Sequence, residues 1–259
     1  MPDDGSAKQD GQIPTNLRLL LVLEEVARAG IPVLPSAVGE ALGLPKPTIH
    51  RLLVTAEEQG FLQRDIDGRS YGPGRRMRQL SMNTLSSHRV RSERLRILKV
   101  LAEEVGETCN LAAPGRDGMV YLDRVETHWP LRIQLPIGSR VPFHCTASGK
   151  MYLASLGYDR LDRLLSNYEL TGQTKRTFTD VTLLKKEIQK VRKLGYSTDT
   201  GEFLDGMAAI AVPICDDQGR LLSTLSIHAP LQRMSLEGLI ENLDRLKTAV
   251  DQLESLVEL

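Results

Sequence analysis

Four polar or basic side chains stand close together in the first quarter of the sequence: Lys46, Thr48, His50 and Arg51. Side chains of these types donate hydrogen bonds to phosphate oxygens and to the edges of bases. Apolar residues of the same segment recur at helical spacing, at Ile49, Leu52, Leu53 and Ala56. This period predicts a helix that buries one face and exposes the polar set near its N-terminus. Such a helix can lie in the major groove of DNA.

A shorter amphipathic segment precedes this helix and is separated from it by a break. Gly43 ends the shorter segment, because glycine readily adopts the positive φ that closes a helix. Pro45 and Pro47 follow and open the second helix, because only the first turn of a helix tolerates proline. Residues 33–62 therefore predict a helix-turn-helix. The alternative is that the two helices belong to an all-helical core.

Two short strands are predicted directly after the second helix. Residues 61–64 and 69–71 have strand character, and the Asp65–Gly68 segment between them is typical of a turn. A hairpin in this position makes the motif a winged helix-turn-helix. Arg64 and Arg69 flank the turn, from where they can reach the DNA backbone or the minor groove.

The bulk composition is that of an ordinary globular protein, with 259 residues, 41% hydrophobic and 25% charged, and zero net charge. This length suits two domains, and no apolar run approaches the ~18 residues that a membrane span needs. The polar, acidic N-terminus does not resemble a signal peptide, so residues 1–13 are interpreted as a disordered lead-in. The three cysteines lie far apart, which argues against a disulfide framework or a zinc site and favours a cytoplasmic location.

The zero net charge hides an asymmetry along the chain. Residues 45–99 contain twelve Lys and Arg against five Asp and Glu. Positive charge gathered around the winged segment is what phosphate binding requires. Four arginines lie near the end of this segment, and for each of them the alternative is that it only makes the surface soluble: Arg89, Arg91, Arg94 and Arg96.

The pattern divides the chain into a winged domain at 14–73, a linker helix at 74–88 and a larger domain at 89–259. A helix over residues 14–30 supports the winged domain, and Gly74 follows its last strand. The linker helix has a thin apolar face, which suggests contact with a second copy of the chain, although a solvent-bridging linker is the alternative. A helix from Val90 to Gly106 opens the larger domain.

The larger domain is predicted to be α+β, with a mostly antiparallel sheet and helices on its faces. Strands are predicted at 109–113, 119–125, 131–135, 208–215 and 221–228, and helices at 147–156, 159–165 and 181–194. The last apolar series, from Leu239 to Val257, alternates steps of four and three. It predicts a terminal helix laid on the sheet, with a coiled-coil seam as the alternative.

The sequence gives little support for a phosphate-binding loop, a catalytic nucleophile, a metal site or a carboxylate pair. The segment Thr146–Lys150 resembles a phosphate loop only superficially, because His144 and Met151 stand where that pattern needs Gly and Ser or Thr. His144 and Cys145 have no clustered ligand or acid partner, so we expect a packed cysteine and a hydrogen-bonded histidine. The carboxylates from Asp123 to Asp205 form no pair that the sequence forces into one site, and Asp199 is either a solvated loop residue or a ligand.

Four segments together resemble the IclR family of bacterial transcription regulators. They are ALGLPKPTIHRLL with EEQGFLQRD, GETCNLAAPGRDGMVYLDRVE, GSRVPFHCTASGKMYLA, and GMAAIAVPICDDQGRLLSTLSIHAP. The resemblance runs from about Thr15 to the C-terminus. It implies an N-terminal winged helix-turn-helix, a linker helix and a C-terminal effector-binding domain with a GAF-like fold, assembled as dimers or dimers of dimers on palindromic operator DNA.

The same resemblance implies an effector pocket at Ala147, Ser148, Asp199, Met207, Ala209, Ser226 and His228. The N-terminus of a helix at Ala147 would favour an anion such as a carboxylate. Ser226 and His228 stand two apart on a strand and so share one face. His228 can then bind a carboxylate as an imidazolium or donate a hydrogen bond when neutral.

The sequence also departs from the family pattern. Pro47 replaces the usual Ser before Thr48 and so removes a hydroxyl that could contact phosphate. Lys46 and Thr48 are then more important for DNA contact. Met207 and Ala209, with Leu122 and Ile133, suggest a roomier, more apolar cavity than that of members with small polar pockets.

We therefore expect a DNA-binding regulator controlled by a small organic or aromatic acid, with no cofactor, metal or catalytic residue. Ligand would favour one dimer arrangement, and the linker helix would change the spacing of the recognition helices. The alternative is a small-molecule sensor or enzyme domain whose N-terminal module binds a protein.

Overall fold

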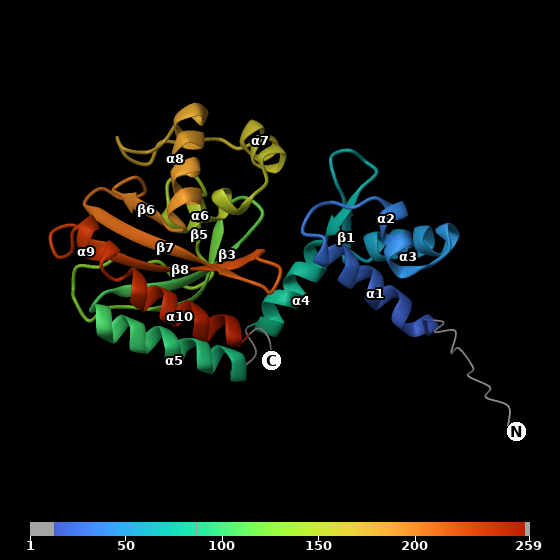
Figure 1. Ribbon diagram of the computed structural model, residues 1–259, viewed down its shortest axis with the longest axis horizontal. Helices are drawn as coiled ribbons and strands as arrows, with labels where there is room; N and C mark the ends of the chain where they lie inside the picture. The colour runs from blue at the N-terminus through green and yellow to red at the C-terminus, as the bar shows by residue number, and fades with distance from the viewer. Residues whose placement is uncertain (1–12, 86–87, 257–259) are drawn as a thin grey trace, which may run out of the picture. The chain divides into compact units, whose positions relative to one another are not determined.

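The computed structural model describes residues 13–85 and 88–256 (Figure 1). Almost all of the predicted lead-in at 1–13 lies outside these residues. The chain forms two compact units, Met1–Leu85 and Ser86–Leu259. A search of the described helices finds none with the length and apolar content that crossing a membrane requires.

The first unit is a winged helix-turn-helix. It comprises α1 (Thr15–Arg28), α2 (Pro35–Leu42), α3 (Lys46–Glu58), β1 (Leu62–Arg64), β2 (Tyr71–Pro73) and α4 (Arg75–Leu85). Gly43 follows α2 with a φ of 61°, as predicted. Pro45 is the extended residue before α3 rather than part of its first turn, where Pro47 lies. Val22, Val26, Val38, Ile49 and Leu53 pack into one core with Leu62 and Tyr71 of the hairpin.

The hairpin excludes the all-helical alternative. β1 and β2 pair antiparallel, with Leu62 opposite Pro73 and Arg64 opposite Tyr71. The returning strand begins at Tyr71 rather than at Arg69 as predicted. The reason is local, because the Asp67 carboxylate accepts hydrogen bonds from the backbone N–H groups of Arg69 and Ser70 and keeps both in the turn.

The second unit is an antiparallel sheet with helices on both faces. Its elements are α5 (His88–Val105), β3 (Thr108–Pro114), β4 (Met119–Val125), β5 (Arg140–Val141), α6 (Ala147–Ser155), α7 (Tyr158–Ser166), α8 (Val181–Leu194), β6 (Ser197–Thr200), β7 (Met207–Cys215), β8 (Leu221–Pro230), α9 (Leu236–Ile240) and α10 (Leu243–Ser255). The strand order is β5-β4-β3-β8-β7-β6. The α+β prediction is confirmed.

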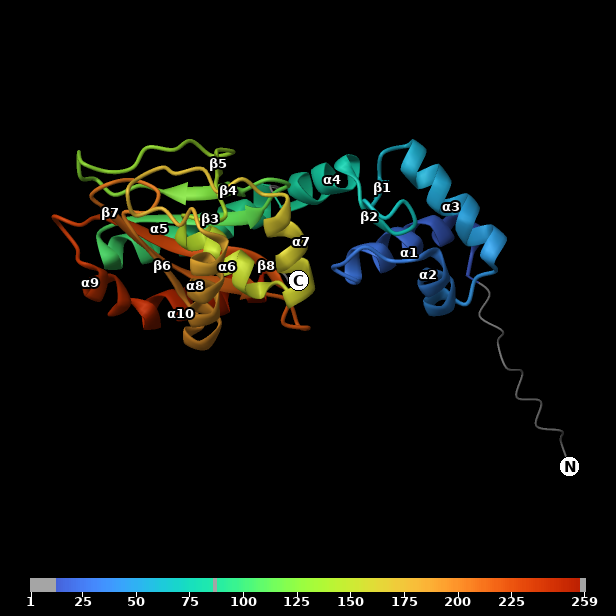
Figure 2. The ribbon, with the colours of Figure 1, turned by 90° about the horizontal axis from the view of Figure 1, so that it is seen from above.

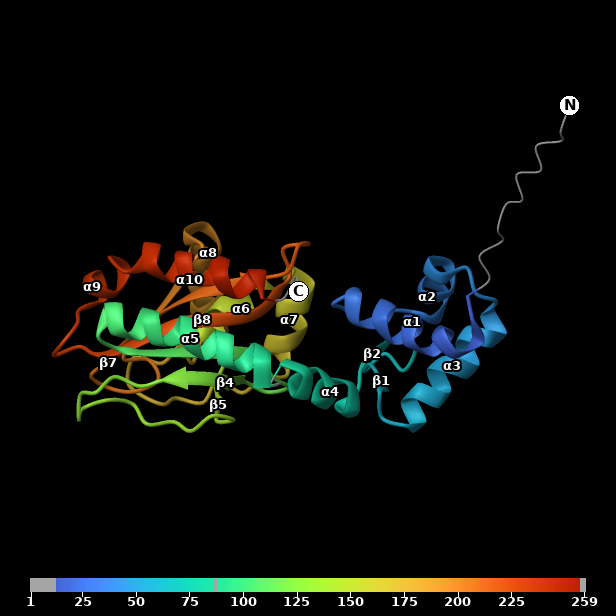
Figure 3. The ribbon, with the colours of Figure 1, turned by 90° about the horizontal axis from the view of Figure 1, so that it is seen from below.

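Two cores lie on opposite faces of this sheet. Helices α5 and α10 run side by side over one face, and α6 and α8 cover the other (Figures 1 and 3). Successive residues of β8 alternate between them, so that Leu225 and Ile227 join the core under α5 and α10. Leu246 and Val250 of α10 join the same core, so the terminal helix lies on the sheet as predicted.

Three details differ from the prediction. Residues 131–135 form a loop rather than a strand, and this loop is held by side chains, because the Arg124 guanidinium donates a hydrogen bond to the carbonyl of Ile133. The short strands β5 and β6 were not predicted. The sequence of β6, STDT, has no apolar residue, so it gives no signal of alternation.

Candidate functional site

The outer face of α3 carries the residues predicted to contact DNA. Lys46, His50 and Arg51 are exposed and Thr48 is half-buried, whereas Ile49 and its neighbours one turn apart are buried. Figure 2 shows α3 along the side of the first unit. Neither Lys46 nor Arg51 forms an ion pair with another described residue, so both cations remain available.

The two arginines of the wing differ in whether their side chains have partners. The Nε of Arg64 lies 3.0 Å from both carboxylate oxygens of Glu57, and its guanidinium lies over the Tyr71 ring. Arg69 is exposed at the turn. Hydrogen bonds from Ser70 and from the backbone of Arg69 lower the pKa of the Asp67 carboxyl at the tip to about 2. The guanidinium of Arg64 is thus already paired with Glu57, whereas the side chain of Arg69 forms no hydrogen bond within the described residues.

Two of the arginines after the winged segment are bound to a buried carboxylate. The Nε atoms of Arg91 and Arg94 lie 3.0 Å and 2.8 Å from the oxygens of Asp123, which is completely buried. Arg96 pairs with Glu93 on the same helix. The side chain of Arg89 lies outside the described residues. The positive balance of residues 45–99 therefore overstates the charge available for DNA, because part of it fastens α5 to β4.

In the second unit, strand register brings most of the implied effector residues together. Ser226 pairs with Ala211 and His228 with Ala209, and Ala209 pairs in turn with Asp199 of β6. The predicted shared face of Ser226 and His228 is confirmed, because Ser226 Oγ lies 3.1 Å from His228 Nε2. Met207, half-buried, pairs with Pro230 at the end of the same strands.

His228 is a neutral imidazole at physiological pH. Burial, with a further contribution from the positive charge of Arg124, lowers the pKa of its ring to about 3. Its ring meets that of Tyr121 edge to face at 6.4 Å between centroids. Of the two predicted binding modes, the structure therefore favours hydrogen bonding by the neutral ring.

Ala147 and Ser148 begin α6, as expected. The hydroxyl of Thr146 caps this helix by accepting the N–H of Gly149 at 3.0 Å. The hydroxyl of Ser148 is buried and has no hydrogen-bond partner among the described residues. A Cβ at position 149 would overlap the backbone of Phe143, so only glycine lets the helix start this close to the preceding loop.

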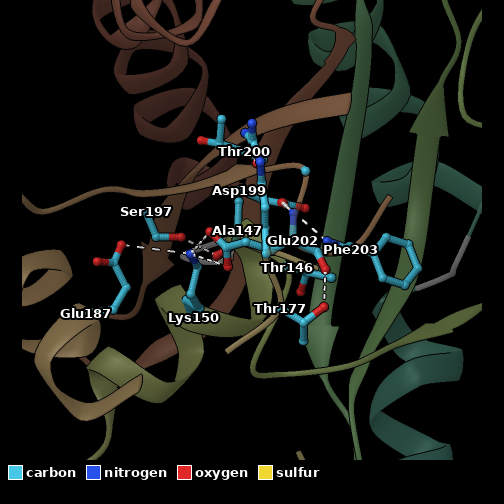
Figure 4. A network of polar contacts seen from close by, with 12 residues as sticks. Thr146, Ala147, Lys150, Thr177, Glu187, Ser197, Asp199, Thr200, Glu202 and Phe203 are labelled. Carbon is cyan, nitrogen blue, oxygen red and sulfur yellow. Dashed lines mark hydrogen bonds and ion pairs between the residues drawn. The ribbon is translucent and has the colours of Figure 1, made fainter. Parts of the chain in front are cut away.

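A buried charge network borders this helix (Figure 4). Lys150 Nζ lies 2.6 Å from both oxygens of Glu202 and 3.8 Å from Glu187. The carboxylate of Asp199 accepts the N–H of Glu202 at 2.7 Å. Burial raises the pKa of Asp199 to about 6 and that of Glu202 to about 7, against the lowering effect of Lys150.

This network corrects one reading of the sequence and adds a residue. Asp199 is not a solvated loop residue, because it is 6% exposed within β6. Lys150 was missed as a functional candidate, since its partner Glu202 is 52 residues away in the chain. The only signal was the Gly149-Lys150 pair itself, which resembled a phosphate loop.

His144 and Cys145 behave as expected. His144 Nε2 lies 3.0 Å from the carbonyl of Thr171, and burial raises the pKa of the Cys145 thiol to about 12. Within residues 13–85 and 88–256, no three His, Cys, Asp or Glu side chains are grouped as a metal would need.

Comparisons with known proteins agree with both halves of this arrangement. Residues 17–65 match the IclR helix-turn-helix domain, and residues 82–255 match the bacterial transcriptional regulator IclR C-terminal domain. The probable transcriptional regulator SauR of Cupriavidus necator is 37% identical over 237 residues, covering 92% of this chain and 94% of that protein. The transcriptional repressor IclR of Escherichia coli is 29% identical, covering 93% and 88%.

Solved structures give the same result. IclR of Thermotoga maritima aligns with a TM-score of 0.62 at 27% identity, over 93% of this chain and 97% of that one. An IclR homologue of Microbacterium hydrocarbonoxydans, solved in complex with 4-hydroxybenzoate, aligns with a TM-score of 0.60 at 27% identity, over 94% and 98%. These relatives are transcriptional regulators rather than enzymes. Because the C-terminal family model matches more than half of the chain and the helix-turn-helix model of the same family matches residues 17–65, the chain belongs to the IclR family of transcriptional regulators.

Proposed function

We propose that α3 binds operator DNA through Lys46, Thr48, His50 and Arg51, with Arg69 contacting the backbone from the wing. The observation that carries this proposal is the exposed polar face of α3, whose cations Lys46 and Arg51 are unpaired among the described residues. Arg64 has a smaller part than the sequence suggested, because Glu57 neutralises it.

We further propose that an organic acid is the effector and lies in the second unit between the sheet and the N-terminus of α6. Its predicted contacts are Ala147, Ser148, Asp199, Met207, Ala209, Ser226 and His228. Support comes from the register that aligns Asp199, Ala209 and His228 across three strands, and from the unpartnered hydroxyl of Ser148 within the described residues. The related protein with bound 4-hydroxybenzoate supports an aromatic acid as one member of this class.

The regulator is proposed to act as a cytoplasmic homodimer or dimer of dimers on a palindromic operator. One α3 helix covers one half-site, and two copies would place their helices about 34 Å apart, one turn of DNA. Effector binding would shift the population between dimer arrangements that fit or miss this spacing. Linker residues 74–88 would transmit this change from the effector-binding unit to the helix-turn-helix unit.

The test is operator binding by Arg51→Ala, with Arg64→Ala as the matched control. Loss of one phosphate contact per half-site lowers the log–log salt slope by about 0.9 per contact. We expect a clear decrease for Arg51→Ala and a much smaller one for Arg64→Ala, measured by fluorescence anisotropy at several salt concentrations. Effector affinity should not change in either variant. Equal effects of the two substitutions on DNA binding would contradict the assignment to α3.

A further inference from the structure

Arg124 and Asn110 lie beside the proposed effector residues but were not among them. In the register of the sheet, Asn110 of β3 pairs with Arg124 of β4 on one side and with Ser226 of β8 on the other. Directly paired residues point to the same face, so all three side chains face the α6 side of the sheet. The hydrogen bond from Ser226 Oγ to the Asn110 carbonyl, at 3.4 Å, joins the last two.

The side chain of Asn110 has an unused donor. Arg124 Nη1 donates to Asn110 Oδ1 at 3.1 Å, and since a guanidinium can only donate, this contact fixes which amide atom is the oxygen. The amide nitrogen Nδ2 is therefore directed elsewhere. It is buried and has no partner among the described residues. A buried N–H group without an acceptor costs about 1–3 kcal/mol, which a ligand oxygen would recover.

The charge at this end of the site is positive. The Arg124 side chain is 4% exposed, and Glu126 is paired both with it, at 3.1 Å, and with Arg132, at 2.6 Å. Two guanidinium groups thus share one carboxylate, which leaves an excess of one positive charge. Burial lowers the pKa of Arg124, since the charged form is partly removed from water. An anion placed beside it would restore the lost stabilisation.

The opposite end of the site is not positive. Near α6, Lys150 faces the carboxylates of Glu202 and Glu187, and Asp199 accepts the N–H of Glu202. The helix N-terminus contributes roughly half a positive charge, which does not offset the surplus of carboxylates. A carboxylate ligand is therefore attracted towards β3 and β4 rather than towards β6.

We propose that Arg124 and Asn110 bind the carboxylate of the effector, which orients an organic acid with its charged group over β3 and β4 and its remainder towards α6. This inference rests on the proposed function, because it assigns one end of the same effector site. Neutral His228 and Ser226 lie next to this end and would add hydrogen bonds without adding charge.

The experiment compares acids with their neutral amides on the full-length protein. Thermal shift and calorimetry would use 4-hydroxybenzoate beside 4-hydroxybenzamide, and glycolate beside glycolamide. We expect at least one acid to raise the melting temperature of the wild type and its amide to have no such effect. Preference for an amide, or absence of any response to either acid, overturns the assignment of an acid to Arg124.

Two variants locate the charged group. Arg124→Gln leaves Glu126 paired with Arg132 but removes the donor to the Ile133 carbonyl, so its melting temperature without ligand is measured first. Asn110→Asp preserves the contact with Arg124 while it removes the free donor. Each should weaken acid binding about 30-fold, the loss expected for a charge-assisted hydrogen bond. The control Arg140→Gln removes an equal charge from an exposed pair with Asp117 and should change affinity less than about threefold.

Operator binding of the same proteins separates the two proposals. If the wild type binds an acid that Arg124→Gln binds equally well, the role of Arg124 is refuted while the regulator function stands. If the wild type binds no DNA, the proposed function fails whatever the acid titration shows.

Discussion

Replacing Asp123 by Asn should destabilise the second unit strongly. Asp123 is completely buried, and its two oxygens face the guanidinium groups of Arg91 and Arg94. The substitution keeps the size of the side chain but removes its charge. Arg94 is itself buried, so it would be left as a cation without an anion.

The size of the effect follows from burial. Removing one partner of a buried ion pair costs about 3–5 kcal/mol, because the remaining charge stays in a poorly polarisable interior. The Arg91 side chain is 44% exposed, so its share is that of a surface pair, about 0–1 kcal/mol. We therefore expect the loss of unfolding free energy in Asp123→Asn to come mainly from Arg94, and Arg91→Ala to lose less than about 1 kcal/mol.

Urea unfolding measures both variants. Trp129 is the only tryptophan of the chain, so its fluorescence follows the second unit alone. The double substitution Arg94→Met with Asp123→Leu should recover much of the loss, because it removes both charges together. If the unfolding free energy of Asp123→Asn lies within about 1 kcal/mol of the wild type with an unchanged slope, the buried pair does not stabilise the packing of α5 on β4.

Three further predictions concern the effector region. Burial raises the pKa of Asp199 to about 6, so its contribution is complete below pH about 4 and is lost as the pH rises to about 6; over this range Asp199→Asn should show a flatter stability curve than the wild type. Gly149→Ala should cost about 1–3 kcal/mol in thermal unfolding, because the added Cβ meets the backbone of Phe143. Ser226→Ala and His228→Ala should shift the effector titration and leave the operator affinity of the free protein unchanged; an unaltered titration would remove both from the site.

The sequence predicts local structure well where backbone chemistry is decisive. Gly43 specifies the end of α2, because few other residues adopt its positive φ, and Pro45 and Pro47 place the start of α3 to within one residue. The shared face of Ser226 and His228 follows from the two-residue period of a strand. The strands β7 and β8 are buried along most of their length, and their apolar runs predict them.

Side-chain contacts between distant segments of the chain cannot be predicted from local sequence patterns. Arg94 and Asp123 are 29 residues apart and Lys150 and Glu202 are 52 apart, and nothing local in the sequence pairs them. From the sequence, Arg94 therefore adds to the cations that favour DNA, and Lys150 stands only in a segment that superficially resembles a phosphate loop. A charge count cannot distinguish a solvated arginine from one enclosed by its partner.

Asp123 and Arg124 are adjacent residues of β4 with side chains on opposite faces of the sheet, the first bound to α5 and the second directed towards the α6 side. A strand is stiff along its length, so rotation about its axis moves both side chains in opposite directions. If an effector binds Arg124 as proposed, a displacement of this peptide unit reaches the first turns of α5 through the contacts of Asp123 with Arg91 and Arg94. That helix starts three residues after α4 ends, so the proposed effector site would be connected through Asp123 to the segment of chain that leads to the winged unit.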